Sequence, residues 1–138
     1  MNSIKFVPMK YTLGKEERLK SKKLIESLYQ KGSSVKAFPL RMIFVQTKHT
    51  SNFPVQMGVS VAKRNFKLAV DRNRIKRLMR ESYRLQKAIV YNNIENPYVF
   101  MISYIGKVEF PYQELHLKME KLLTLFLKET KTAKNDEN

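Results

Sequence analysis

The sequence DRNRIKRLMRESYR, residues 71–84, spaces its apolar side chains with the period of an α-helix. At about 100° per residue, one side of this helix collects six mostly apolar side chains: Ile75, Leu78, Met79, Ser82, Leu85 and Ile89. The opposite side presents six cations, with the amide of Asn73 among them: Arg72, Lys76, Arg77, Arg80, Arg84 and Lys87. Arg74 lies at the border between the two sides. The pattern predicts a helix, ending near residue 92, that docks on a core and exposes a row of positive charge.

The positive charge of the chain is concentrated around this helix. Residues 60–87 contain ten Lys or Arg against Asp71 and Glu81, and so supply more than half of the net charge of +15. A charged helix face is most often merely solvated, but like charges four residues apart repel one another. A basic surface gathered on one element is typical of nucleic-acid binding. We therefore predict that an anionic partner covers this face.

The composition fits one globular domain of the cytoplasm. The 138 residues are 43% hydrophobic, enough for a single core. The isoelectric point of about 10.1 favours polyanions such as RNA, DNA or an anionic membrane surface. The absence of cysteine excludes disulfides and thiolate metal sites. No apolar run approaches the ~20 residues of a membrane span, and no signal peptide is evident; we expect a cytoplasmic protein.

The segments on either side of the basic helix have clear signals of their own. Ser21 is a suitable N-cap for a helix that runs to about Gln30, with Gly32 just beyond its end. We expect strands at residues 34–37, 40–47, 55–62 and 98–105, and a last helix after Phe110-Pro111. Alternation along the second strand places Leu40, Met42 and Phe44 on one face, and Arg41, Ile43 and Val45 on the other.

The order helix, three strands, helix, strand, helix predicts an α/β sandwich, that is, an α+β fold with helices packed on a four-stranded sheet. We expect one RNA-binding domain over residues 18–130. An irregular N-terminal arm over residues 1–17 and a disordered polar tail over 131–138 would flank it. If the strands on either side of the basic helix are parallel, the general rule predicts a right-handed crossover between them.

The residue types that a protein nuclease needs are not grouped in this sequence. Its twelve acidic residues are scattered, without the spacing of a two-metal site. His49 and His116 lie on different predicted elements, and we expect both at the surface rather than paired for acid–base work. The sequence therefore predicts a binding protein with no catalytic or metal-ligating residues of its own.

Two segments carry a resemblance to a known family. Gly58-Val59-Ser60-Val61-Ala62-Lys63-Arg64-Asn65 and the following Ala69–Tyr83 stretch, with its Arg-Asn-Arg-x-Lys-Arg-x-x-Arg core, resemble the signature of the bacterial ribonuclease P protein component. The resemblance continues upstream through Glu17-Arg18-Leu19-Lys20-Ser21-Lys22-Lys23 and Gly32, and it covers about residues 15–128. It implies a left-handed crossover instead of the right-handed one.

The resemblance also implies a function. Ribonuclease P removes the 5′ leader of precursor tRNA, and its large RNA subunit performs the chemistry with bound Mg²⁺. The positions that match the family's contacts to that RNA subunit are Lys63, Arg64, Arg72, Asn73, Arg74, Lys76, Arg77 and Arg80. The cleft for the leader matches Ile25, Tyr29, Arg41, Ile43 and Val45. Only Tyr29 is aromatic among these, which favours shape and charge over stacking in this cleft.

The resemblance implies two partners, the ribonuclease P RNA subunit and precursor tRNA, and no membrane or obligate protein partner. Two other readings stay open from the residues alone. One is a different binder of structured RNA, such as a ribosome-associated protein. The other is a membrane-surface protein with a basic amphipathic helix. The absence of Trp and Phe anchors from residues 71–92, and the need for their apolar side in a core, argue against the membrane.

Overall fold

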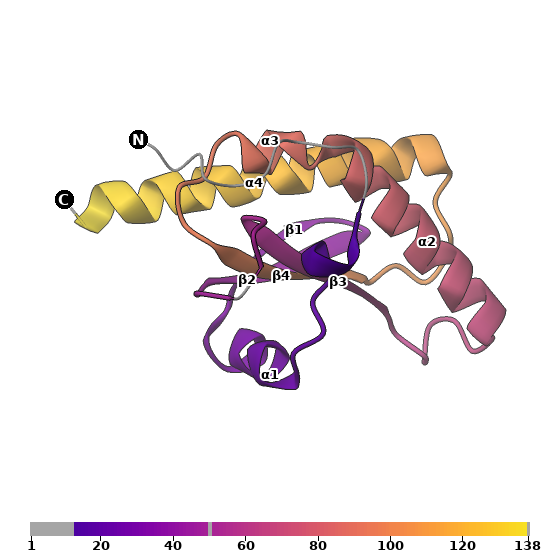
Figure 1. Ribbon diagram of the computed structural model, residues 1–138. Coiled ribbons are helices and arrows are strands. Elements are labelled where there is room, and N and C mark those ends of the chain that lie inside the picture. The colour runs from indigo at the N-terminus through magenta and orange to yellow at the C-terminus, as the bar shows by residue number, and fades with distance from the viewer. Residues whose placement is uncertain (1–12, 50, 138) are drawn as a thin grey trace.

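A four-stranded sheet lies between α1 on one face and α2, α3 and α4 on the other (Figure 1). This computed structural model describes residues 13–49 and 51–137, with the side chains of 132–137 excepted. The elements in order are η1 Lys15–Glu17, α1 Lys22–Lys31, β1 Ser33–Ala37, β2 Leu40–Gln46, β3 Val55–Val61, α2 Ala69–Gln86, α3 Ala88–Tyr91, β4 Tyr98–Tyr104 and α4 Tyr112–Glu137. The predicted α+β sandwich is confirmed.

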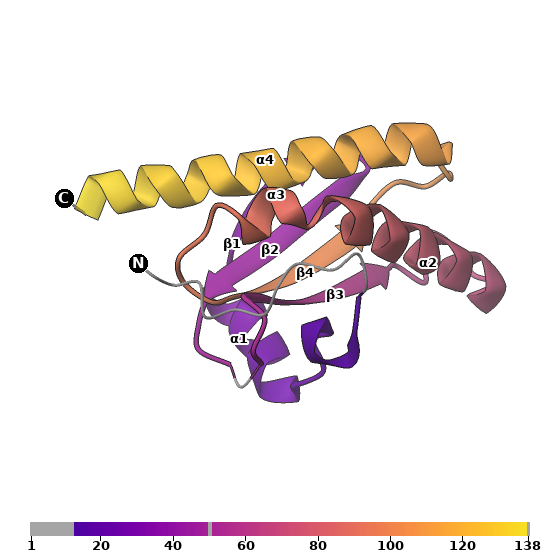
Figure 2. The same ribbon diagram turned by 45° about the horizontal axis from the view of Figure 1, so that its top comes forward.

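The sheet has the strand order β1-β2-β4-β3, and only the β3–β4 pair is parallel. The chain leaves β3, crosses the helical face through α2 and α3, and returns in β4 beside β3. When both strands point upward and that face is toward the viewer, β4 lies to the left of β3 (Figure 2). The crossover is therefore left-handed, as the family resemblance implied and against the general rule.

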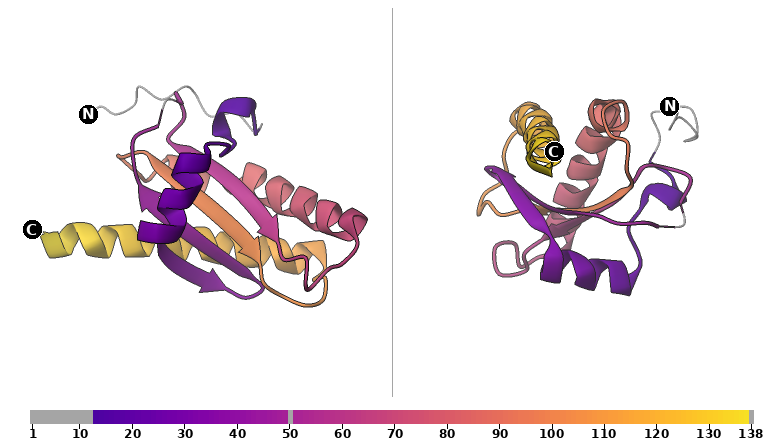
Figure 3. Two further views of the ribbon diagram at one scale, coloured as in Figure 1. Left: turned by 90° about the horizontal axis from the view of Figure 1, so that it is seen from below. Right: turned by 90° about the vertical axis from the view of Figure 1, so that its left-hand side faces the viewer.

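The alternation of β2 separates two cores. Leu40, Met42 and Phe44 point to the side of α2 and α4, where Phe126 of α4 meets Phe44 and Phe100 at ring-centroid distances of 4.8 and 4.7 Å. A smaller core lies under α1 and contains Leu19, Leu28, Val99 and Met101. Helices on both sides bury β4 almost completely, which explains its nearly continuous apolar sequence (Figure 3).

The ends of α1 are determined by the two residues that the sequence indicated. Ser21 Oγ accepts a hydrogen bond from the Leu24 N–H at 3.2 Å. At the other end, a Cβ on Gly32 would lie 2.4 Å from the Leu28 carbonyl oxygen and 2.5 Å from Ile43 Cγ2. Only glycine allows this close approach, so Gly32 brings the end of α1 down onto β2.

The chain termini differ from the expectation. α4 continues to Glu137, although residues 131–138 were expected to form a disordered tail. Residues 131–137 contain no Gly or Pro, and their Lys, Ala and Glu favour a helix, so nothing ends α4 before them. In the expected arm, residues 1–12 lie outside the described residues. Lys15–Glu17 form a 3₁₀ turn, and Glu17 is only 1% exposed, so the ordered domain begins before residue 18.

Candidate nucleic-acid interface

The basic helix α2 docks on the sheet through one side, as predicted. Ile75, Met79, Ser82 and Tyr83 are buried, while Asn73 and Arg77 are exposed. The apolar sector is rotated slightly from the expected one. Leu78 is only partly buried against the core, and Leu85 is 41% exposed, because the side of the helix that carries Leu78 and Leu85 lies beyond the centre of the contact.

Two of the cations on α2 are neutralised within the protein. Arg74 forms ion pairs with Asp71 and Glu109, and these acids raise its pKa, with Glu109 having the larger effect. Arg84 pairs with Glu81 at 2.6 Å, which raises the pKa of Arg84 and lowers that of Glu81. Arg74 was predicted to contact RNA; the structure places it in a brace between α2 and the loop before α4.

Arg72 organises the loop that precedes α2. Its Nη1 donates to the carbonyl oxygens of Phe66 and Lys67 at 2.8 and 2.9 Å. The loop carries the exposed Lys63 and Arg64. Because one terminal nitrogen makes both bonds, the other guanidinium N–H groups of Arg72 stay available to an anion. Arg72 thus positions its neighbours and keeps donors of its own.

The remaining predicted cations have no acidic partner in the part of the chain that the structure describes. These are Lys63, Arg64, Lys76, Arg77 and Arg80. They lie on the loop before α2 and on the first two-thirds of α2, together with the exposed amide of Asn73. Uncompensated positive charge on one rigid element is suited to the phosphates of a nucleic acid.

Lys87 does not belong to this surface, contrary to the helical projection. Its side chain is 1% exposed, and its ammonium donates to Glu17 Oε1 at 2.5 Å; the Tyr91 hydroxyl donates to the same oxygen at 2.5 Å. Burial raises the pKa of Tyr91, as does the neighbouring Tyr83. α2 ends at Gln86, but the backbone of Lys87 is still helical, so its side chain lies one turn after the buried Tyr83 and meets Glu17 from the distant N-terminal segment. A projection that continues one helix through residue 89 cannot reveal this.

The predicted leader cleft lies on the opposite face of the sheet from α2. Ile25, Ile43 and Val45 pack beside the small core under α1, where they are half-buried. Tyr29 extends from the last turns of α1 with 58% of its surface exposed, and Arg41 is exposed on β2. The structure therefore brings all five residues to one side of the sheet.

A polar row that the sequence analysis missed adjoins these five residues. The strand register aligns Lys36 with Arg41, Arg41 with Ser103, and Ser103 with Ser60 across the sheet. The hydroxyl oxygens of Ser60 and Ser103 lie 2.7 Å apart. In the sequence, Ser103 is noticeable because it interrupts the apolar run of residues 98–105. Only the strand register shows that it lies opposite Arg41.

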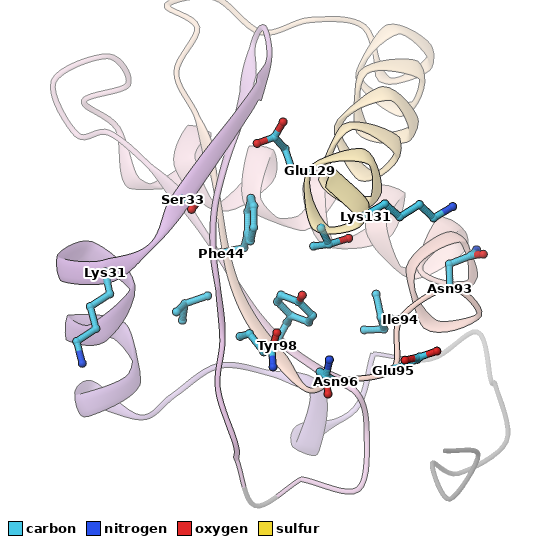
Figure 4. A pocket seen from close by; sticks show the side chains of 13 residues that line it. Lys31, Ser33, Phe44, Asn93, Ile94, Glu95, Asn96, Tyr98, Glu129 and Lys131 are labelled. Carbon is cyan, nitrogen blue, oxygen red and sulfur yellow. The ribbon is translucent and has the colours of Figure 1, made fainter. Parts of the chain in front are cut away.

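A separate hollow of about 710 Å³ lies between the end of β2, the start of β4 and the second half of α4 (Figure 4). Phe44, Tyr98 and Ile94 contribute apolar surface to it. Its charged lining residues are Lys31, Glu95, Glu129 and Lys131. Because bases and acids are balanced there, this hollow lacks the excess of positive charge that distinguishes the α2 surface.

The histidines occupy different parts of the molecule. His116 was expected at the surface but lies half-buried between α2 and α4, with Nδ1 3.1 Å from Ser82 Oγ, and its carbonyl accepts from Gln86 Nε2 at 3.0 Å. His49 is also half-buried, and burial lowers its pKa. Among the described side chains, those of residues 13–49 and 51–131, no three His, Cys, Asp or Glu are placed to hold a metal ion. Over the same part of the chain, no helix is long and apolar enough to cross a bilayer.

Comparison with known proteins gives a consistent result. The family model described as Ribonuclease P matches residues 13–126. The ribonuclease P protein component of Porphyromonas gingivalis is 35% identical over 94 residues, which cover 67% of this chain and 68% of that protein. The protein of the same name from Chlorobium phaeobacteroides is 42% identical over 79 residues, covering 55% of this chain and 54% of its own length.

Solved structures show the same fold. The RNase P protein of Staphylococcus aureus superposes with a TM-score of 0.65 at 23% identity, covering 79% of this chain and 94% of that one. The RNase P protein from Thermotoga maritima superposes with a TM-score of 0.63 at 20% identity, covering 78% of this chain and 94% of that one. The family model spans most of the chain, including the basic helix and both faces of the sheet, and the chain belongs to the ribonuclease P protein family.

Proposed function

We propose that this chain binds the RNA subunit of ribonuclease P through α2 and its entering loop, and binds the 5′ leader of precursor tRNA beside α1. In this role it assists the Mg²⁺-dependent removal of the leader in the cytoplasm. The observation that carries the proposal is the set of cations without acidic partners, among the described residues, on and before α2, of which Lys63, Arg64 and Arg77 are exposed. Membership in the ribonuclease P protein family is the reason for proposing these two RNAs as its partners.

The chemistry of the site is electrostatic. Two RNA molecules repel each other, and a protein whose cations contact both reduces that repulsion and releases bound counterions. Arginine forks can hold phosphate oxygens in pairs, which fixes orientation as well as distance. The bonds of Arg72 to the loop hold Lys63 and Arg64 beside the helix, so less conformational entropy is lost on binding.

The protein's own carboxylates do not fit a magnesium site in the described structure. Glu17, Asp71, Glu81 and Glu109 are all ion-paired with Lys or Arg, and they lie on different elements. In the proposal the RNA subunit holds the Mg²⁺ and performs the hydrolysis. The protein contributes binding and position.

Reconstitution tests this function directly. The purified protein is mixed with a bacterial ribonuclease P RNA at low Mg²⁺, and cleavage of a precursor tRNA at the mature 5′ end is measured. We expect little cleavage by either component alone and efficient cleavage by the mixture. Binding to folded RNA without any stimulation of cleavage would instead favour another role among structured RNAs. The protein incubated alone with precursor tRNA and Mg²⁺ is the necessary control.

A further inference from the structure

Among residues 13–49 and 51–131, only two aromatic side chains are exposed, Tyr29 at 58% and Phe38 at 51%. They lie at opposite ends of the β1–β2 hairpin. Tyr29 is near the end of α1, which leads through Gly32 into β1, and Phe38 is in the turn between β1 and β2. Figure 3 shows α1 at one end of this hairpin and the turn at the other. The hairpin therefore offers the aromatic surface that is open to stacking in the described part of the chain.

The turn that carries Phe38 is fixed to the loop before α4. The Ile105 N–H donates to the Pro39 carbonyl at 2.8 Å. A Cβ on Gly106 would lie 3.0 Å from Pro39 Cβ, so glycine lets the loop approach the turn closely. The ring of Phe110 meets that of Phe38 edge-on, with 6.0 Å between the centroids. Phe38 is thus held in place while half of its surface stays open, so less conformational entropy is lost when a ligand stacks on it.

Cations without acidic partners border this turn. Lys36 and Arg41 lie directly opposite each other in the strand register, so they share the α1 face of the sheet. Lys107 is exposed on the adjoining loop. None of the three forms an ion pair within the described residues. Residues 33–46 contain no acid, and Glu109 of the loop is bound by Arg74. A ring beside such cations fits a nucleotide, whose base stacks while its phosphate meets the charge.

We propose that Phe38 stacks on a base of the single-stranded 5′ leader of precursor tRNA and that Lys36 binds an adjoining phosphate. Stacking on a side chain needs an unpaired base, which the leader supplies, whereas bases in the helices of a folded RNA are already paired. Lys36 also lies opposite Arg41, which belongs to the predicted leader cleft. The inference rests on the proposed function and extends the leader contact beyond that cleft.

The length of the hairpin sets the spacing of the two stacked bases. β1 has five residues, which span about 17 Å at about 3.3 Å per residue. A stacked strand of nucleic acid rises about 3.4 Å per nucleotide, so this length corresponds to about five nucleotides. One leader can therefore reach both Tyr29 and Phe38. Because every base has a stacking face, the contact at Phe38 should tolerate any leader sequence.

The test uses three substitutions of Phe38. Phe38→Ala removes the ring, Phe38→Tyr keeps it, and Phe38→Leu keeps an apolar side chain without a ring. Val108→Ala is the matched control, because it removes an apolar side chain, 66% exposed, from the adjoining loop. Dissociation constants are measured for the RNA subunit with each protein, and for precursor and mature tRNA with each reconstituted complex. The precursor measurement is repeated with leaders that carry one abasic nucleotide at successive positions, and thermal melts establish folding.

Phe38→Ala should weaken the binding of precursor tRNA by about 5- to 150-fold, the range for the loss of one stacked base. Phe38→Tyr should retain most of the affinity, Phe38→Leu should lose most of it, and Val108→Ala should change nothing. Mature tRNA and the RNA subunit should bind all variants equally. One abasic position should abolish the effect of Phe38→Ala, and another, about five nucleotides away, that of Tyr29→Ala. Lys36→Ala should lower the slope of log affinity against log salt by about 0.7 for precursor tRNA alone.

Three results would overturn the inference: unchanged precursor affinity in Phe38→Ala, an equal loss with mature tRNA, or a loss that adds to that of every abasic position. A loss confined to the RNA subunit would also overturn it, because the base would then belong to that RNA. If Arg77→Ala weakens binding to the RNA subunit while Phe38→Ala binds precursor tRNA normally, the leader contact fails and the proposed function stands. If the reconstituted parent complex does not cleave precursor tRNA, the proposed function fails and the inference fails with it.

Discussion

Arg74 of α2 bridges Asp71, one turn earlier in the same helix, and Glu109 in the loop before α4. The contact joins the beginning of the basic helix to the beginning of the last helix. It also withdraws one cation of the Arg-Asn-Arg motif from the surface that the other cations form. Arg74 therefore braces two helix ends, and Arg72 holds the loop before α2, while the RNA contacts expected of both remain predictions.

The first prediction concerns this brace. Arg74→Ala should lower the melting temperature, and the loss should become smaller in high salt because the ion pairs are partly exposed and screened. Affinity for the RNA subunit should change less than in Arg77→Ala. Glu109→Gln, which removes the charge of the other side of the brace, should reproduce the stability loss. A large loss of RNA affinity in Arg74→Ala with normal melting would show that Arg74 contacts RNA directly.

The second prediction concerns the exposed cation Arg77. Arg77→Ala should reduce the slope of log affinity against log salt for the RNA subunit by about 0.7–0.9, since one phosphate contact is lost. Stability should be unchanged, because Arg77 has no acidic partner among the described residues. The matched control is Lys121→Ala, which removes an exposed cation from α4 and so measures the effect of losing one positive charge elsewhere on the protein. An unchanged slope would remove Arg77 from the interface.

The third prediction concerns the side of α2 that docks on the sheet. The helical projection placed Leu78 near the middle of the buried side, but Met79 is fully buried and Leu78 only partly so. Met79→Ala should therefore cost about 2–5 kcal/mol of unfolding free energy, the range for buried large-to-small changes. Leu78→Ala should cost less. Equal losses in denaturant melts would mean that the helix is rotated relative to this structure.

Local features of the sequence were sufficient for much of the fold. The caps Ser21 and Gly32, the alternation of β2 and the period of α2 can each be recognised within one short segment of the sequence. The left-handed crossover came from the family resemblance, because no local pattern determines handedness. The end of α4 was missed because the polar residues 131–137 were interpreted as a tail, although they contain no Gly or Pro that would end a helix.

Contacts between distant segments account for what the sequence could not reveal about the site. The ion pairs Glu17–Lys87 and Arg74–Glu109 each join residues more than thirty positions apart. The number of Lys and Arg residues in the sequence does not distinguish cations that are paired within the protein from those that are not. Only their tertiary partners separate a buried structural lysine from a surface that is free to bind phosphate.

The fourth prediction tests the buried pair. Lys87→Met should leave the Glu17 carboxylate without its cation, and breaking such a pair costs about 3–5 kcal/mol. Glu17→Gln combined with Lys87→Met should recover a large part of that loss, because no uncompensated charge stays buried. Denaturant unfolding of the single and double variants measures both effects. A single variant as stable as the parent protein would show that Lys87 is not enclosed as described.

The fifth prediction separates substrate binding from RNA-subunit binding. Tyr29 is 58% exposed at the end of α1, while its neighbour Leu28 is fully buried, so Tyr29 can be removed without opening the core. If a leader base stacks on its ring, Tyr29→Ala should weaken the binding of precursor tRNA by about 1–3 kcal/mol. Mature tRNA lacks the leader and should bind as before, and affinity for the RNA subunit should not change. Tyr29→Phe keeps the ring and should retain most of the affinity. Equal losses for precursor and mature tRNA would instead indicate that Tyr29 does not contact the leader.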